Sequence, residues 1–203
     1  LKLDSETGII SGTPTVAGDY AIRITVSDSD SKKVEEEFNI KIDSNNEVLQ
    51  LLHEDDYAAL KALYQSTDGD NWRNNTGWSE WDFSNSTPPD ASVVDNWHGV
   101  TVVDDKITKL SLYNKLTGKI PNELGNLSNL QGLYLSHNKL TGEIPNELGN
   151  LSNLQSLYLD DNKLTGEIPN ELGNLSNLQN LRLYSNKLTG EIPNELGNLS
   201  NLQ

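Results

Sequence analysis

A repeat of 24 residues fills the second half of the chain and limits the folds that are open to it. Residues 133–156 read LYLSHNKLTGEIPNELGNLSNLQS, and the segment returns at 157–180 and, incomplete, at 181–203. A slightly altered copy precedes them at 110–132. The same spacing separates four prolines, Pro121, Pro145, Pro169 and Pro193. A fixed period of this length indicates a solenoid, in which each repeat forms one coil and buries its apolar side only against its neighbours.

The positions within one coil have distinct structural roles. Leu133 and Leu135 alternate as in a short strand, and stacked copies predict a parallel sheet with strands about 4.8 Å apart. We place Gly142 and Gly149 where the chain bends sharply. The first coil is one residue shorter than the others between Leu112 and its asparagine, so we expect a distorted first rung. An asparagine amide carries donors and an acceptor for backbone groups that leave the sheet, which predicts a ladder of Asn114, Asn138, Asn162 and Asn186.

The pattern LxLxxNxLTGxIPxxLGxLxxL resembles the plant-type leucine-rich repeats, and it covers nearly the whole second half of the chain. The resemblance implies a solenoid whose strands line a concave face, the surface on which ligands usually bind in that family. We therefore expect about four coils over residues 110–203, open at the C-terminal end.

Residues 1–43 are predicted to form strands, because apolar and polar residues alternate from Tyr20 to Val26 and again from Phe38 to Ile42. The run LDSETGIISGTPTVAGDYAIRITVSDSD resembles the last part of the immunoglobulin-like or cadherin-like modules of bacterial surface proteins. That resemblance implies an incomplete β-sandwich. It also makes calcium a candidate cofactor, since such modules hold it with carboxylates of turns and linkers. The candidate ligands are Asp4, Glu6, Asp28, Asp30 and Asp43, and solvated turn acids are the alternative interpretation.

Residues 44–109 show neither the strand alternation of the first segment nor the 24-residue repeat. Apolar residues at helical spacing from Tyr57 to Tyr64 predict a helix with Asp55 or Asp56 as its N-cap, ending near Thr67. All four tryptophans follow, and the order helix, NW, GW, WHGV looks like the N-terminal cap of bacterial leucine-rich repeat proteins. A first coil needs such a cover, and large aromatic side chains can supply it. Sugar-binding platforms are the other use of exposed tryptophans. We expect residues 82–96 to form an exposed loop.

The predicted architecture is thus mixed. A partial immunoglobulin-like β-sandwich, residues 1–43, precedes a helical, tryptophan-rich cap, residues 44–109, and the leucine-rich repeat solenoid, residues 110–203.

The net charge of -15 argues against nucleic acid as a partner, because nucleic acid binding needs a basic surface. No apolar run is long enough to span a membrane. The chain has no cysteine, which excludes disulfides and suits a bacterial or archaeal surface protein better than a plant receptor.

The coils differ from one another mainly where the strand faces solvent. This variation falls on the face that the resemblance makes concave, and tyrosine and arginine are frequent in binding hot spots. The predicted ligand-binding residues are Tyr113, Tyr134, Ser136, His137, Tyr158, Asp160, Asp161, Arg182 and Tyr184. Drift on an unused surface is the alternative, because tyrosine also suits strands intrinsically.

The sequence shows no catalytic motif, phosphate loop or zinc spacing, so we expect no enzyme activity and, calcium apart, no cofactor. His53, His98 and His137 are far apart in sequence, and we expect His137 to be a surface residue without a partner.

The leading hypothesis is an extracellular, non-enzymatic binding or adhesion segment of a larger secreted or surface protein, with a protein or glycan ligand on the concave face. Two alternatives remain. The first is a structural subunit whose coils associate end to end in a filament. The second is ice binding by a regular row of hydroxyls on Thr117, Thr141, Thr165 and Thr189.

Overall fold

The computed structural model describes residues 2–3, 10–11, 18–27, 33–42 and 48–203, and the chain divides into two compact units, residues 1–51 and 52–203. In the first unit β3 (Gly18–Ser27) pairs antiparallel with β4 (Lys33–Ile42), which pairs in turn with β5 (Val48–Leu49). Two further short strands, β1 (Lys2–Leu3) and β2 (Ile10–Ser11), pair with each other. The predicted boundary at residue 43 differs from this division, because β5 belongs to the sheet of the first unit.

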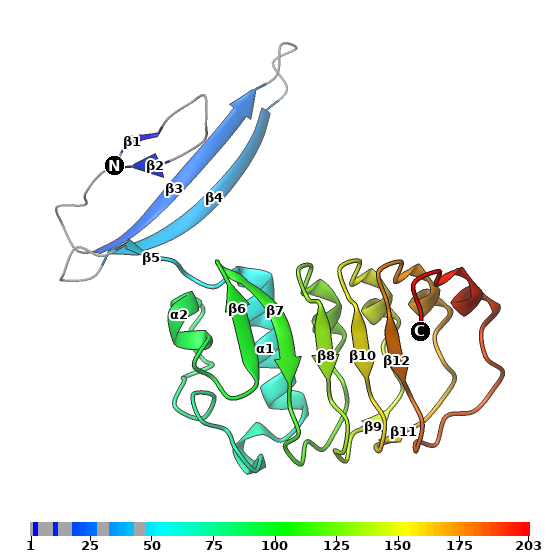
Figure 1. Ribbon diagram of the computed structural model, residues 1–203. Helices are drawn as coiled ribbons and strands as arrows, with labels where there is room; N and C mark the ends of the chain where they lie inside the picture. Colours follow the sequence, from blue (N-terminus) through cyan, green and yellow to red (C-terminus); the bar gives the residue numbers. More distant parts are fainter. Residues whose placement is uncertain (1, 4–9, 12–17, 28–32, 43–47) are drawn as a thin grey trace. The chain divides into compact units, whose positions relative to one another are not determined.

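The second unit is a stack of coils whose main strands form one five-stranded sheet (Figure 1). The strands follow one another in space in the order β12 (Asn180–Arg182), β10 (Ser156–Tyr158), β8 (Gly132–Tyr134), β7 (Lys106–Ser111) and β6 (Val100–Val103). Strand β6 is antiparallel to β7, and the others are parallel. The register joins equivalent leucines of successive coils, such as Leu133 with Leu157. The parallel sheet predicted from the repeat is confirmed.

Each coil returns behind the sheet through a 3₁₀ turn that begins after its proline. The turns are η2 (Asn122–Asn126), η3 (Asn146–Asn150), η4 (Asn170–Asn174) and η5 (Asn194–Asn198). A second, two-stranded parallel sheet links β9 (Thr141–Gly142) to β11 (Lys163–Leu164). Between the layers, the leucines of the first coils are fully buried. Gly142 bends the chain with φ +79°, but Gly149 serves another purpose: a Cβ there would lie 2.4 Å from the Glu171 carbonyl oxygen of the next coil.

The cap consists of α1 (Glu54–Ser66), η1 (Gly69–Asn71), α2 (Ala91–Val94) and the segments between them. Helix α1 packs beside η2 and so covers the apolar side of the first coil. Seven aromatic rings, two of them on α1, form a continuous cluster in the cap, with neighbouring ring centroids 4.9 to 6.5 Å apart. Trp72, Trp78 and Trp97 are buried in this cluster. The tryptophans therefore serve as packing of the cap, and these three present no platform for a sugar.

Two expectations about the cap are wrong. The N-cap of α1 is His53, whose ring nitrogen accepts a hydrogen bond from the Asp55 N–H at 3.3 Å. Asp56 is fully buried instead and accepts a hydrogen bond from the Ile107 N–H at 2.6 Å, which ties α1 to β7. Burial raises the pKa of Asp56 above its ordinary value, and the hydrogen bond from Ile107 opposes this rise. Residues 82–96 are not an exposed loop, because they contain α2 and the buried Phe83 and Pro88.

The asparagine of each coil bonds to the backbone of the coil before it. The Asn138 amide donates to the carbonyl oxygens of Leu112 at 2.7 Å and Leu135 at 2.9 Å, and its Oδ1 accepts from the N–H groups of Asn114 and Leu116. Asn162 and Asn186 repeat the arrangement one and two coils further on. Asn114, in the first coil, bonds to both backbone groups of Asn74 in the cap.

The first rung is distorted, as its missing residue predicts. Later coils place one residue in the left-handed region directly before the asparagine: His137 (φ +53°), Asp161 (φ +52°) and Ser185 (φ +53°). In the first coil the left-handed residue is Lys115, which follows Asn114. The turn thus moves by two positions while the asparagine keeps its place in the ladder.

Replacing Asn138 by alanine should lower the free energy of unfolding by about 3 kcal/mol or more, because several buried backbone groups lose their partners together. Asn153 gives the matched control, since its amide makes one exposed hydrogen bond, to the Ser128 carbonyl at 2.8 Å. Asn153→Ala should cost about 1 kcal/mol or less. Urea unfolding of the two variants measures the difference. Equal losses would show that the ladder does not hold the coils together.

Candidate ligand-binding face

The open face of the sheet β7–β8–β10–β12 carries a shallow depression of about 300 Å³, and we call this surface the concave face. Side chains from all four strands and from the turns that follow them line the depression. They are Lys109, Ser111, Tyr113, Tyr134, Ser136, His137, Tyr158, Asp160, Arg182 and Tyr184. Eight of these ten belong to the predicted set, and Asp161 is the one predicted residue that does not line the depression.

One row of side chains crosses the face as two aromatic rings flanked by two cations. Arg182 lies over the Tyr158 ring, with its guanidinium carbon 4.2 Å from the ring centroid. Tyr158 meets Tyr134 edge to face at 5.0 Å, and Lys109 lies 5.2 Å over the Tyr134 ring. The parallel register brings Tyr134, Tyr158 and Arg182 side by side, because they occupy the same position in three successive coils. We call Lys109, Tyr134, Tyr158 and Arg182 the cation–aromatic row.

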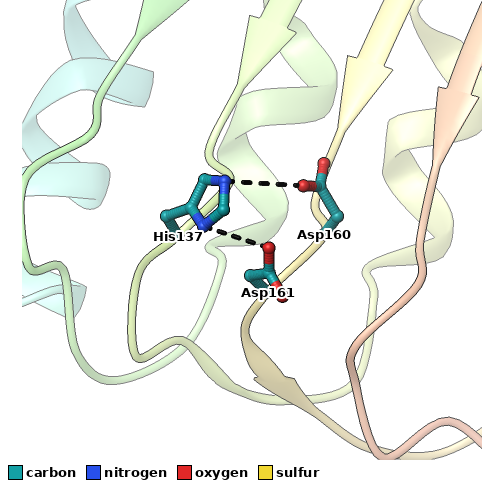
Figure 2. Close-up of side chains that lie close together, drawn as sticks. All are labelled: His137, Asp160 and Asp161. Carbon is teal, nitrogen blue, oxygen red and sulfur yellow. Dashed lines mark ion pairs between the residues drawn. The ribbon is translucent and has the colours of Figure 1, made fainter.

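A second group lies where the strands end, at the turns. Figure 2 shows the His137 ring directed at two carboxylates of the next coil. Its Nδ1 is 3.0 Å from Asp161 Oδ2, and its Nε2 is 4.0 Å from Asp160 Oδ2. The ring of Tyr113 packs against the His137 ring with centroids 4.7 Å apart. The hydrogen bond between the Tyr184 hydroxyl and Asp160 raises the pKa of Tyr184, and desolvation and the charge of Asp160 add to the rise.

The structure corrects the prediction at three of the site residues. Ser136 and Asp160 are buried rather than solvent-facing, with 4% and 1% of their surface exposed. They face each other from successive coils, and the Ser136 hydroxyl donates to Asp160 Oδ1 at 2.5 Å. His137 is exposed as expected, but it is not without a partner, because the left-handed turns bring it to the two aspartates. Sequence spacing missed this cluster, since its members are 23 and 24 residues apart.

Lys109 and Ser111 are the lining residues that the sequence analysis missed. Both lie on β7, where the register pairs Lys109 with Gly132 and Ser111 with Tyr134. A strand-by-strand alignment that included the shortened first coil would have placed them on the face. The five proposed calcium ligands, Asp4, Glu6, Asp28, Asp30 and Asp43, lie outside the described residues.

The other two histidines lie in the cap, away from the concave face. His53 caps α1, with Nδ1 3.9 Å from Asp55 Oδ2, and His98 Nδ1 contacts the Asn74 side chain at 3.1 Å. Among the described helices, none is long and apolar enough to cross a bilayer.

The contact between Arg182 and Tyr158 should be measurable as a coupling free energy. Both side chains are partly in solvent, so a double-mutant cycle with Arg182→Met and Tyr158→Leu should give about 0.5–1 kcal/mol. Urea unfolding of the two single variants and the double variant supplies the numbers. A coupling of zero within error would show that the row is a chance arrangement of side chains.

Comparisons with known proteins agree with this architecture. A family model described as a leucine-rich repeat region matches residues 107–203, and one described as a putative Ig domain matches residues 1–43. No curated protein sequence matches the chain. Many solved structures do.

Three of these solved structures show how similar the matching proteins are to this chain. The BIR2 ectodomain from Arabidopsis thaliana is 36% identical, with a TM-score of 0.63 over 73% of this chain and 77% of that one. The structure of PEPR1–AtPEP1 is 32% identical, with a TM-score of 0.61, and the match covers 74% of this chain but only 21% of that chain. A plant ice-binding protein is 30% identical, with a TM-score of 0.62, over 75% of this chain and 47% of that chain. The chain therefore belongs to the leucine-rich repeat proteins.

Proposed function

We propose that the chain is an extracellular, non-enzymatic binding segment that captures a protein partner on the concave face. The observation that carries this proposal is the cation–aromatic row, which concentrates the side chains of binding hot spots on one accessible surface. Tyr113 and Tyr184 extend the aromatic surface at the turns, with 53% and 57% of their surface exposed. The relatives support the same use of the fold, since the PEPR1 structure is described as a PEPR1–AtPEP1 pair.

The charge distribution supports a specific partner over a general adhesive role. The chain has a net charge of -15, yet the row begins with Lys109 and ends with Arg182. Two fixed cations beside aromatic rings suit a partner segment that carries acidic and apolar side chains. A glycan ligand is the other class that aromatic rings serve, and it would use the same rings without needing the cations.

The wider setting of the chain is also a proposal. The putative Ig domain at residues 1–43 supports a modular surface protein in which that module is a spacer. The absence of cysteine supports a bacterial or archaeal source, because it removes the cystines that close the caps of plant receptors.

Alanine substitutions of Tyr134, Tyr158, Arg182 and Tyr184 together should strongly weaken ligand capture without unfolding the solenoid. The experiment first selects ligands of the wild-type chain from arrays of extracellular proteins and of glycans, and then measures the affinity of each hit. We expect the hits to be proteins and the variant to lose about 30-fold or more in affinity.

The control carries Lys139→Ala, Lys163→Ala and Lys187→Ala, three exposed residues outside the lining of the depression. It should bind as the wild type does. Retained binding by the concave-face variant, or equal loss in the control, would refute the assignment of this face. Hits confined to glycans would replace the protein partner by a carbohydrate.

Ice binding is a second candidate, because a plant ice-binding protein is among the similar structures. The regular threonine row is the feature that would serve it. However, Thr141 donates its hydroxyl to the Gly118 carbonyl at 3.0 Å, and Thr189 donates to Gly166 at 3.3 Å, so two of the four hydroxyl protons already have acceptors within the protein.

We therefore expect no thermal hysteresis from the purified chain in a nanolitre osmometer. Hysteresis that disappears in a Thr141→Tyr, Thr165→Tyr variant, but persists in the concave-face variant, would move ice binding to first place.

A further inference from the structure

His137 and Asp161 occupy equivalent slots in consecutive coils. Each is the left-handed residue before the ladder asparagine, and Asp160 directly precedes Asp161, two residues after β10 ends. His137, Asp160 and Asp161 each offer one possible ligand atom, and these three atoms lie within 4.8 Å of one another. Figure 2 shows Asp160 beside one ring nitrogen of His137 and Asp161 beside the other.

We propose that His137, Asp160 and Asp161 form a binding site for a divalent transition-metal ion, with Zn²⁺ as the reference ion. His137 Nε2 and Asp160 Oδ2 are the ligands. Asp161 Oδ2 holds the Nδ1 side of the ring, 3.0 Å away, and so directs Nε2 toward the ion. A carboxylate on the far nitrogen of a metal-binding histidine is the usual way in which proteins orient the ring and increase its basicity.

The burial of Asp160 is the first argument for a cation. Its side chain is 2% exposed, and among the described residues no lysine or arginine lies within 4.0 Å of it. Its Oδ1 accepts from the Ser136 hydroxyl, its Oδ2 faces His137, and the Tyr184 hydroxyl is a second neutral partner. A buried carboxylate without a full positive charge beside it is costly, and a bound divalent ion would offset that cost.

The geometry is the second argument. Bonds to Zn²⁺ from a histidine nitrogen and a carboxylate oxygen are about 2.0–2.2 Å long, so one ion can join atoms up to about 4.2 Å apart. The 4.0 Å between His137 Nε2 and Asp160 Oδ2 falls within this reach. Small rotations of the exposed histidine would bring the angle at the ion closer to a tetrahedral value.

The surroundings hold the ligands in place. The Tyr113 ring packs on one side of the imidazole, and the Ser136 hydroxyl fixes the Asp160 carboxylate. All four side chains line the depression of the concave face, so the remaining coordination positions would face a bound partner or water. The imidazole ligand favours zinc, nickel, copper or cobalt, whereas calcium and magnesium prefer a set of oxygen ligands.

The proposal stands on this cluster alone and does not require that the concave face bind a protein. The test titrates the EDTA-treated chain with Zn²⁺ and follows the imidazole signals of its three histidines by NMR, with calorimetry for the stoichiometry. We expect one equivalent to bind and to shift the signals of His137 alone. Ca²⁺ at the same concentration should leave them in place.

Three variants sharpen the test. His137→Asn should weaken binding at least about tenfold, and asparagine tolerates the left-handed backbone there. Asp160→Asn should do the same while keeping an acceptor for Ser136. Asp161→Asn should weaken binding by about 10-fold to 100-fold, as expected for a residue that orients a ligand.

His53→Ser is the matched control, because it removes another histidine beside an aspartate but keeps a good N-cap for α1. It should bind Zn²⁺ as the wild type does. The proposal fails if wild-type His137 does not shift, if His137→Asn binds equally well, or if Ca²⁺ competes on equal terms. Circular dichroism of each variant separates loss of binding from loss of fold.

Discussion

The structure of the second unit depends on how the polar backbone is satisfied between coils. A strand of three residues followed by a turn leaves N–H and C=O groups that the next strand cannot reach, and one ladder asparagine in each coil supplies partners for them. Because the bonds run to the preceding coil, the first asparagine needs a coil before it. The cap provides the backbone of Asn74 in that role. The cap is therefore continuous with the solenoid in its hydrogen bonding as well as in its apolar packing.

Regular coils leave the outward strand positions free to vary. The leucines, the ladder asparagine and the glycines are fixed by contacts between coils, as Gly149 is by the carbonyl of Glu171. No contact between coils fixes the residue type at the outward positions. The strand register alone therefore decides which of these side chains become neighbours. Tyr134, Tyr158 and Arg182 meet for that reason, although nothing in their local sequence marks them as a set.

Much of this architecture could be predicted from the sequence, because in a strict repeat each coil must bury the same positions and pair the same backbone groups. The parallel sheet, the inward leucines and the distorted first rung all follow from spacing. The cap was less predictable in detail: Asp56 looks like a helix N-cap but is drawn into the core by the free N–H of Ile107. Within the site, the face was predictable, whereas the burial of Ser136 and Asp160 depends on a contact between coils that spacing does not reveal.

The left-handed slot before each ladder asparagine has a consequence for how such a protein can change. Among side chains other than glycine, that backbone favours asparagine, aspartate and histidine and disfavours branched or bulky ones. The substitutions most compatible with the slot therefore include two common metal ligands, and successive slots are brought together by the stacking of the coils. His137 and Asp161 occupy two adjacent slots, and in the proposed site His137 is the ligand and Asp161 orients it. If the proposed site binds an ion, single changes in these slots would add or remove it at the surface and leave the leucine core unchanged.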